Sequence, residues 1–152
     1  MLPSIIHSAV MAGIFARLPM LTTHLVIFDT AVVELTGRMD DPVETLMSVH
    51  LGGGTDIAKA VGYCKELITA PRRTIVVLVS DLCEGGSRQS LYRTCHDIVE
   101  SGARLIALTA LNEHSVPDYD RATAQTLADL GAHVGAMTPE RLADFMAGIM
   151  RE

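Results

Sequence analysis

The sequence is poor in the residues that mark several common classes of protein. It has no tryptophan and only three phenylalanines and three tyrosines, so the 49% of hydrophobic residues are mostly aliphatic. With 152 residues and a positive mean hydropathy, the chain can fill one sizeable core, and we expect one compact domain. It has no run of lysines and arginines and a formal net charge of -6, which argues against nucleic acid as the main partner.

Cysteine is scarce as well. Cys64, Cys83 and Cys95 are odd in number and form no C-x-x-C pair, which is typical of a protein in a reducing compartment. The apolar segment 1–16 carries Pro3 and His7, has no basic start, and falls short of the roughly 20 apolar residues that a membrane-spanning helix needs. We therefore expect a cytoplasmic protein in which this segment forms a buried amphipathic helix.

The most informative stretch is a triple glycine, Gly52 to Gly54, followed by Thr55 and Asp56. Glycines allow a sharp turn and leave backbone amides open to a ligand. Thr55 and Asp56 are typical caps for the first amides of a helix, and apolar residues at 57, 61, 64 and 68 predict that helix. Such a turn can serve a metal, a phosphate or chain geometry alone.

Strands and helices alternate along the chain. The runs 23–29 and 31–35 predict an antiparallel strand pair, and the uninterrupted apolar run 74–79 predicts a buried parallel strand. Further strands are expected over 104–111 and 132–137, and helices over 42–47, 56–69, 91–101, 118–130 and from 139 onward. The pattern predicts an α/β fold with three α/β/α Rossmann-like layers and a mostly parallel sheet with an antiparallel edge strand.

Asp81 follows the most apolar of these strands. In sheets of this kind ligands bind beyond the carboxyl ends of the strands. The Thr55 hydroxyl and the Asp81 carboxylate suit a hard cation such as Mg²⁺ or Mn²⁺, which prefers oxygen ligands. Glu84 is a further candidate for touching a partner or a metal-bound water. A simpler interpretation stays open, in which Thr55 caps a helix and Asp81 caps a loop.

The tracts 52–57 and 75–81, with Gly85 and Gly86 behind them, resemble the von Willebrand factor A (VWA) domain, and most of all its CoxE-like bacterial group. The tracts 25–29, 41–44 and 135–139 add to the resemblance, which spans essentially the whole chain. It implies that residues 1–152 form a single VWA-like domain that binds protein partners and is not an enzyme. CoxE-like domains typically work beside MoxR-type AAA+ ATPases in maturing or remodelling other protein complexes.

The resemblance also implies a metal-ion-dependent adhesion site, in which a divalent cation binds an acidic residue of the partner. Thr55 matches the family's metal-ligating threonine, and Asp81 matches its later aspartate. The partner-binding loops would contain Gly53, Gly54, Asp56 and Glu84.

One family motif, D-x-S-x-S at the end of the first strand, is absent from the sequence. We therefore expect a chain that starts one strand late and binds Mg²⁺ or Mn²⁺ weakly or not at all, because most of the ligand set is missing. The missing strand belongs between 23–29 and 74–79, where its loss would leave a gap of about 10 Å between neighbours. Either these two strands pair directly, or chains form a homo-oligomer through the exposed edges.

Two other functions stay open at this point. The loop Gly52 to Gly54 could hold phosphate in a nucleotide- or phosphate-binding α/β enzyme, although it is neither G-x-G-x-x-G nor a P-loop. The chain could also be an inactive truncated fragment.

Overall fold

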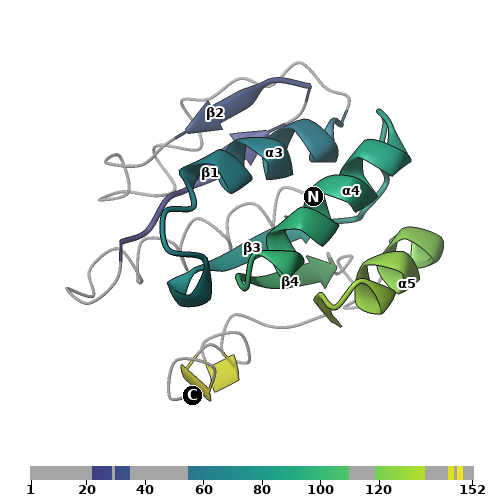
Figure 1. Cartoon of the computed structure of the whole chain (residues 1–152). Coiled ribbons are helices and arrows are strands. Elements are labelled where there is room, and N and C mark those ends of the chain that lie inside the picture. The colour runs from purple at the N-terminus through teal and green to yellow at the C-terminus, as the bar shows by residue number, and fades with distance from the viewer. Residues whose placement is uncertain are drawn as a thin grey trace.

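The computed structural model describes residues 22–28, 30–34, 55–109, 119–135, 144–145 and 147–148. Its elements, shown in Figure 1, are the strands β1 (Val26–Phe28), β2 (Val32–Glu34), β3 (Ile75–Ser80), β4 (Arg104–Thr109) and β5 (His133–Gly135), the helices α3 (Ile57–Leu67), α4 (Arg88–Glu100) and α5 (Arg121–Asp129), and the 3-10 helix η1 (Pro71–Arg73).

The main sheet is parallel and has the strand order β3-β4-β5. Its register runs from Ile75 opposite Arg104 to Ser80 opposite Thr109. The central strand β4 is buried from Leu105 to Thr109, as expected for an apolar strand covered on both faces. β1 and β2 form a separate antiparallel pair, with Ile27 opposite Val33. The predicted α/β class, with a mainly parallel sheet and an antiparallel strand pair, is confirmed.

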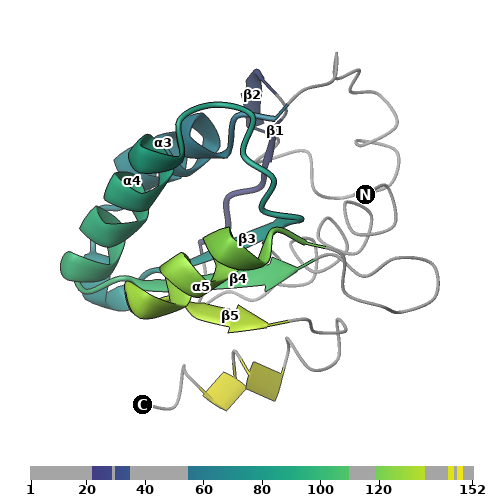
Figure 2. The same ribbon diagram turned by 90° about the vertical axis from the view of Figure 1, so that its right-hand side faces the viewer.

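Figures 1 and 2 show α3, α4 and α5 on one side of the parallel sheet. The apolar faces of the helices meet the sheet in one core cluster, which includes Ile57, Val61, Leu91, Ile98 and Leu127. On the other face of the sheet, Phe145 packs against the buried Ile106 and Leu108. The core is aliphatic, as the composition predicts.

The helix boundaries follow the capping chemistry. α4 and α5 end before Gly102 and Gly131, whose φ angles of +101° and +106° lie in the left-handed region that favours glycine. α5 begins at Arg121 rather than at the predicted residue 118, because the Asp120 side chain caps the amides of Ala122 and Thr123.

The described strands form two sheets, whereas the sequence predicts one. β1 pairs with β2 and packs against α3, while β3 pairs with β4, and within the described residues β1 and β3 are not neighbours in a sheet. The expectation that these two strands pair directly is therefore wrong for the described part of the chain. Figure 2 shows the β1–β2 pair apart from the parallel sheet.

Several predicted features lie outside the described residues. They are the helices over the first 18 residues and over 42–47, the glycines 52–54, and most of the last helix, of which residues 144, 145, 147 and 148 are helical. Among the helices that the structure describes, none combines the length and the apolar character needed to cross a membrane.

Candidate functional site

Three chain segments meet at the carboxyl end of β3. The loop after β3 is joined to the segment before α3 by a hydrogen bond from the Gly85 amide to the Thr55 carbonyl, 2.9 Å long. It is joined to the segment before α5 by a bond of the same length from the Asp120 amide to the Asp81 carbonyl. Thr55 and Asp81 therefore belong to one loop cluster, at the end of the sheet where the sequence places them.

The turn after β3 is fixed by its own side chains. The Leu82 amide donates to Ser80 Oγ, and the Cys83 amide donates to Asp81 Oδ1; each hydrogen bond is 3.0 Å long. These bonds hold Leu82 at a φ of +61°, in a region that a branched side chain rarely adopts. The Leu82 side chain is fully buried, so its packing in the core offsets the backbone cost.

Gly85 lets two backbones approach closely. A Cβ atom built on Gly85 would lie 2.6 Å from the Thr55 carbonyl oxygen, which is shorter than real Cβ contacts. Glycine is therefore needed at this position for the loop to bind the segment before α3.

Glu84 caps α3 across the loop cluster, a role that the sequence analysis missed. Its Oε1 accepts the Ile57 amide at 3.0 Å and its Oε2 accepts the Ala58 amide at 2.8 Å. Oε1 also accepts the Gly86 amide at 3.0 Å. Glu84 is 27 residues from Ile57, so no local pattern could reveal this cap. Its predicted part in partner binding stays a prediction.

The sequence predicts that Thr55 and Asp56 both cap α3, and half of this prediction is correct. Asp56 is the N-cap, and its Oδ1 accepts the Lys59 amide at 3.0 Å. The other free amides are taken by Glu84, whereas Thr55 contributes its carbonyl to Gly85. Glu84 fits better because one carboxylate can reach two successive amides at the positive end of the helix dipole.

The first amides of two helices in this cluster are thus occupied by carboxylates of the chain itself. Glu84 and Asp56 accept the first amides of α3, and Asp120 accepts those of α5. Arg88 also forms an ion pair with Asp120, at 3.1 Å. The Thr123 amide, above all, lowers the pKa of Asp120, and the Arg88 guanidinium adds to this effect. A phosphate bound at the start of α3 would have to displace Glu84 and would meet the charge of Asp56, which argues against the phosphate-binding alternative.

Thr55 and Asp81 keep oxygen atoms that no described residue uses. The Thr55 hydroxyl makes no hydrogen bond with the described part of the chain, and Asp81 uses Oδ1 for its turn but not Oδ2. These are oxygen ligands of the kind that Mg²⁺ and Mn²⁺ prefer, but two of them are fewer than a tight site needs. Within the described ranges no group of three or more His, Cys, Asp or Glu residues could hold a metal. The oxygen atoms of Thr55 and Asp81 are suitable ligands for a divalent cation, but the described residues provide too few of them for tight binding.

The comparisons with known proteins agree on the type of domain. The family described as "VWA domain containing CoxE-like protein" has a model that matches residues 1–146. The Uncharacterized protein YehP of Escherichia coli (strain K12) is 50% identical over 147 residues, which are 97% of this chain and 39% of YehP. The chain therefore spans well under half the length of this relative.

Two solved structures share the fold. An aerotolerance-related membrane protein from Bacteroides fragilis NCTC 9343, carrying multiple mutations to serine, has a TM-score of 0.69 at 11% identity, with 98% of this chain and 89% of that chain covered. The conserved hypothetical protein BatB from Bacteroides thetaiotaomicron has a TM-score of 0.64 at 10% identity, with 99% and 87% covered. At this level of identity, the likeness concerns the fold alone.

Proposed function

Because this chain belongs to the VWA domain containing CoxE-like family, we propose that it is a non-enzymatic adaptor that binds a protein partner through the loop cluster at the carboxyl end of β3. The observation that carries the proposal is the way in which these loops are held before any partner arrives. The bonds Gly85 to Thr55 and Asp120 to Asp81, with the buried Leu82, fix the surface, so little ordering entropy opposes binding.

The partner contact that we propose uses the Thr55 hydroxyl and Asp81 Oδ2, with Asp56 beside them. An acidic partner side chain would be repelled by Asp81 unless a cation lay between the two carboxylates. Mg²⁺ or Mn²⁺ would supply that charge, held weakly by the chain alone and more firmly once the partner adds oxygen ligands. Gly53 and Gly54 belong to the same proposed surface, although they lie outside the described residues.

The family membership supports one proposal for the kind of partner. We propose a MoxR-type AAA+ ATPase system in the cytoplasm and a role in maturing or remodelling protein complexes, with residues 1–152 acting as one VWA-like domain. The net charge of -6 supports a protein partner rather than nucleic acid.

Titration calorimetry with a purified MoxR-type ATPase from the same organism, without nucleotide, tests the proposal. The informative variants are Thr55→Ala, which keeps the carbonyl that binds Gly85, and Asp81→Asn, which keeps the Oδ1 that binds Cys83. Asp129→Asn, at the far end of α5, is the matched control. We expect the unmodified chain and the control to bind in MgCl2, and binding to fall at least about tenfold in Asp81→Asn and in EDTA, a loss of about 1.4 kcal/mol.

MnCl2 titrated alone should bind only weakly, on the order of millimolar, as suits so few oxygen ligands. If Asp81→Asn binds the ATPase as tightly as the unmodified chain, the loop cluster is not part of the interface. If no MoxR-type ATPase binds at all, the proposed partner class is wrong.

A further inference from the structure

A groove of about 540 Å³ lies on the outer side of α3. It is lined by Lys59, Gly62, Tyr63 and Glu66 of α3, by Lys65 of the same helix, by Val32 of β2 and by Thr94 of α4. The first four recur at the spacing i, i+3, i+4 and i+7, so they form one stripe along the helix. The opposite face of α3, with Ile57, Ala60 and Val61, is buried in the core. Lys59, Gly62, Tyr63 and Glu66 therefore form an outer stripe on α3.

Nothing in the described part of the chain requires glycine at position 62. Gly62 lies in the interior of a helix, its φ is not positive, and a Cβ built on it would meet no atom of the described residues within 4 Å. Glycine at such a position destabilises a helix relative to alanine. The missing side chain leaves the floor of the groove open, which favours an occupant that approaches the helix closely.

The two ends of the outer stripe carry opposite charges that the described chain does not neutralise. Lys59 Nζ donates to the Thr30 carbonyl at 3.3 Å and to no carboxylate of the described residues, and Glu66 forms no ion pair with any of them. Lys65, by contrast, pairs with Asp97 at 3.0 Å. Lys59 and Glu66 are seven residues apart, or about 10 Å along the helix.

Tyr63 stands next to Gly62 in a fixed orientation. Its hydroxyl donates to Glu34 Oε2, and Glu34 Oε1 contacts His24 Nδ1 at 2.9 Å. This hydrogen bond to Glu34 is also the main cause that raises the pKa of Tyr63, so the hydroxyl stays protonated as a donor. While β2 is in place, the Tyr63 ring therefore forms one wall of the groove, next to Gly62.

We propose that the occupant of this groove is the outer stripe of a second copy of the chain, packed antiparallel across a two-fold axis. In that arrangement Lys59 of each copy faces Glu66 of the other, and Tyr63 of each copy covers Gly62 of the other. The stripe is thus complementary to itself in charge, and it sets an aromatic ring of each copy against a glycine of the other, as an interface with two-fold symmetry allows. α3 has 11 residues, about 16 Å, so the contact is small and the dimer is weak, in the micromolar range.

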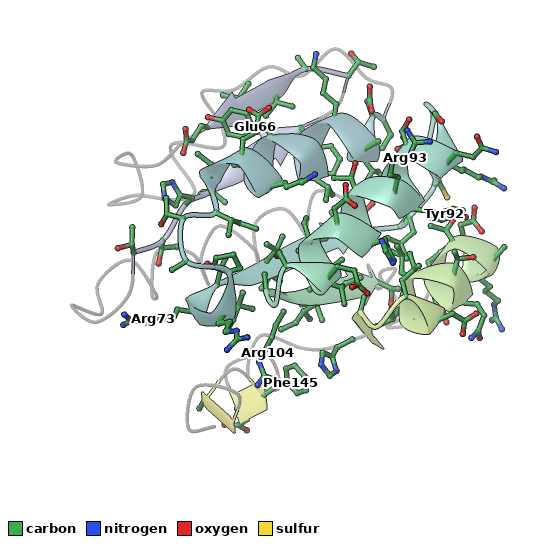
Figure 3. The ribbon with its side chains drawn as sticks, in the orientation of Figure 1. Glu66, Arg73, Tyr92, Arg93, Arg104 and Phe145 are labelled. Carbon is green, nitrogen blue, oxygen red and sulfur yellow. The ribbon has the colours of Figure 1, made fainter. Side chains whose placement is uncertain are left out.

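Sedimentation velocity on the 152-residue chain over a wide concentration range tests the dimer. The unmodified chain should shift from monomer to dimer as its concentration rises. Lys59→Glu and Glu66→Lys should each weaken association at least about tenfold, because each places two pairs of like charges across the axis. Figure 3 shows Glu66 on α3, apart from Arg73 on η1, so Arg73→Glu is a control with the same change in charge and should dimerise normally.

The decisive sample is an equimolar mixture of Lys59→Glu and Glu66→Lys chains. Every facing pair in the mixed dimer has opposite charges, so the mixture should associate at least about tenfold more tightly than either variant alone. Gly62→Leu should fold, since the space above Gly62 is open, and should lose the dimer because the new side chain displaces Tyr63 of the second copy.

A chain that stays monomeric up to about 1 mM would overturn the proposal. Association that persists in Lys59→Glu or in Gly62→Leu would also overturn it, since another surface, such as a strand edge, would then hold the copies together. Failure of the mixture to associate has the same meaning. None of these outcomes depends on the loop cluster or on its partner, so the proposed function is tested separately.

Discussion

Gly85 and Gly86 are neighbours, but only the first is held against another backbone. A Cβ on Gly85 would lie 2.6 Å from the Thr55 carbonyl oxygen, whereas one on Gly86 would lie 3.5 Å from its nearest neighbour, Asp56 Oδ1. We expect Gly85→Ala to lower the free energy of unfolding by about 1 to 3 kcal/mol, as overpacking does. Gly86→Ala should change it by less than about 0.5 kcal/mol.

Urea unfolding of both variants measures this difference. Equal stabilities would mean that the loop after β3 can move away from Thr55 at no cost, and the fixed surface proposed for partner binding would lose its basis.

At the residue scale, the roles that the sequence reveals are those set by near neighbours. Asp56 caps an amide three residues on, and Asp81 accepts one two residues on, so both were within reach of local patterns. Glu84 serves amides 26 and 27 residues away, and the left-handed Leu82 is held by its burial. Such roles depend on tertiary packing, which no short pattern contains.

Among the elements, α5 depends on one titrating cap. The pKa of Asp120 is lowered in the folded chain, first by the Thr123 amide, so the carboxylate stabilises the fold above the pKa of an unfolded aspartate. That contribution is lost as the pH falls through the folded pKa. We expect the free energy of unfolding to decline as the pH falls from about 5 to about 3.

Urea unfolding at a series of pH values checks this expectation. Asp120→Asn keeps an acceptor oxygen but does not titrate, so its curve should be flatter than that of the unmodified chain. Asp120→Ala should lose about 1 kcal/mol at pH 7, as other helix caps do. Some dependence on pH remains in both variants, since the hydrogen bond from Lys65 lowers the pKa of Asp97. An unchanged slope in Asp120→Asn would show that the cap is not the titrating group.

The elements themselves were largely predictable. The apolar stripe through Ile57 and Val61 gives α3, the uninterrupted apolar runs give β3 and β4, and glycines end α4 and α5. These signals come from periodicity and turn chemistry within one segment. The division into two sheets is a matter of pairing between distant segments, which periodicity does not encode.

At the scale of the molecule, the two sheets are attached by different means. β4 is hydrogen-bonded on both sides, to β3 and to β5, and its residues are buried. Among the described residues, the β1–β2 pair has three residues in each strand and is attached to α3 by packing and by side-chain hydrogen bonds that include Lys59 to Thr30 and Tyr63 to Glu34. A pair of such short strands has little stability of its own.

The shortness of the β1 and β2 strands implies that the chain opens in stages. The free energy of local unfolding is lowest where backbone hydrogen bonds are few and close to solvent. The β1–β2 pair should therefore detach from α3 while the parallel sheet stays intact. In native-state hydrogen exchange, the amides of β1 and β2 should exchange through this small opening, and those of β4 only when the whole domain unfolds. Since Tyr63 is oriented through Glu34 of β2, each such opening also releases the wall of the α3 groove, which links the lifetime of the hairpin to the lifetime of the proposed dimer.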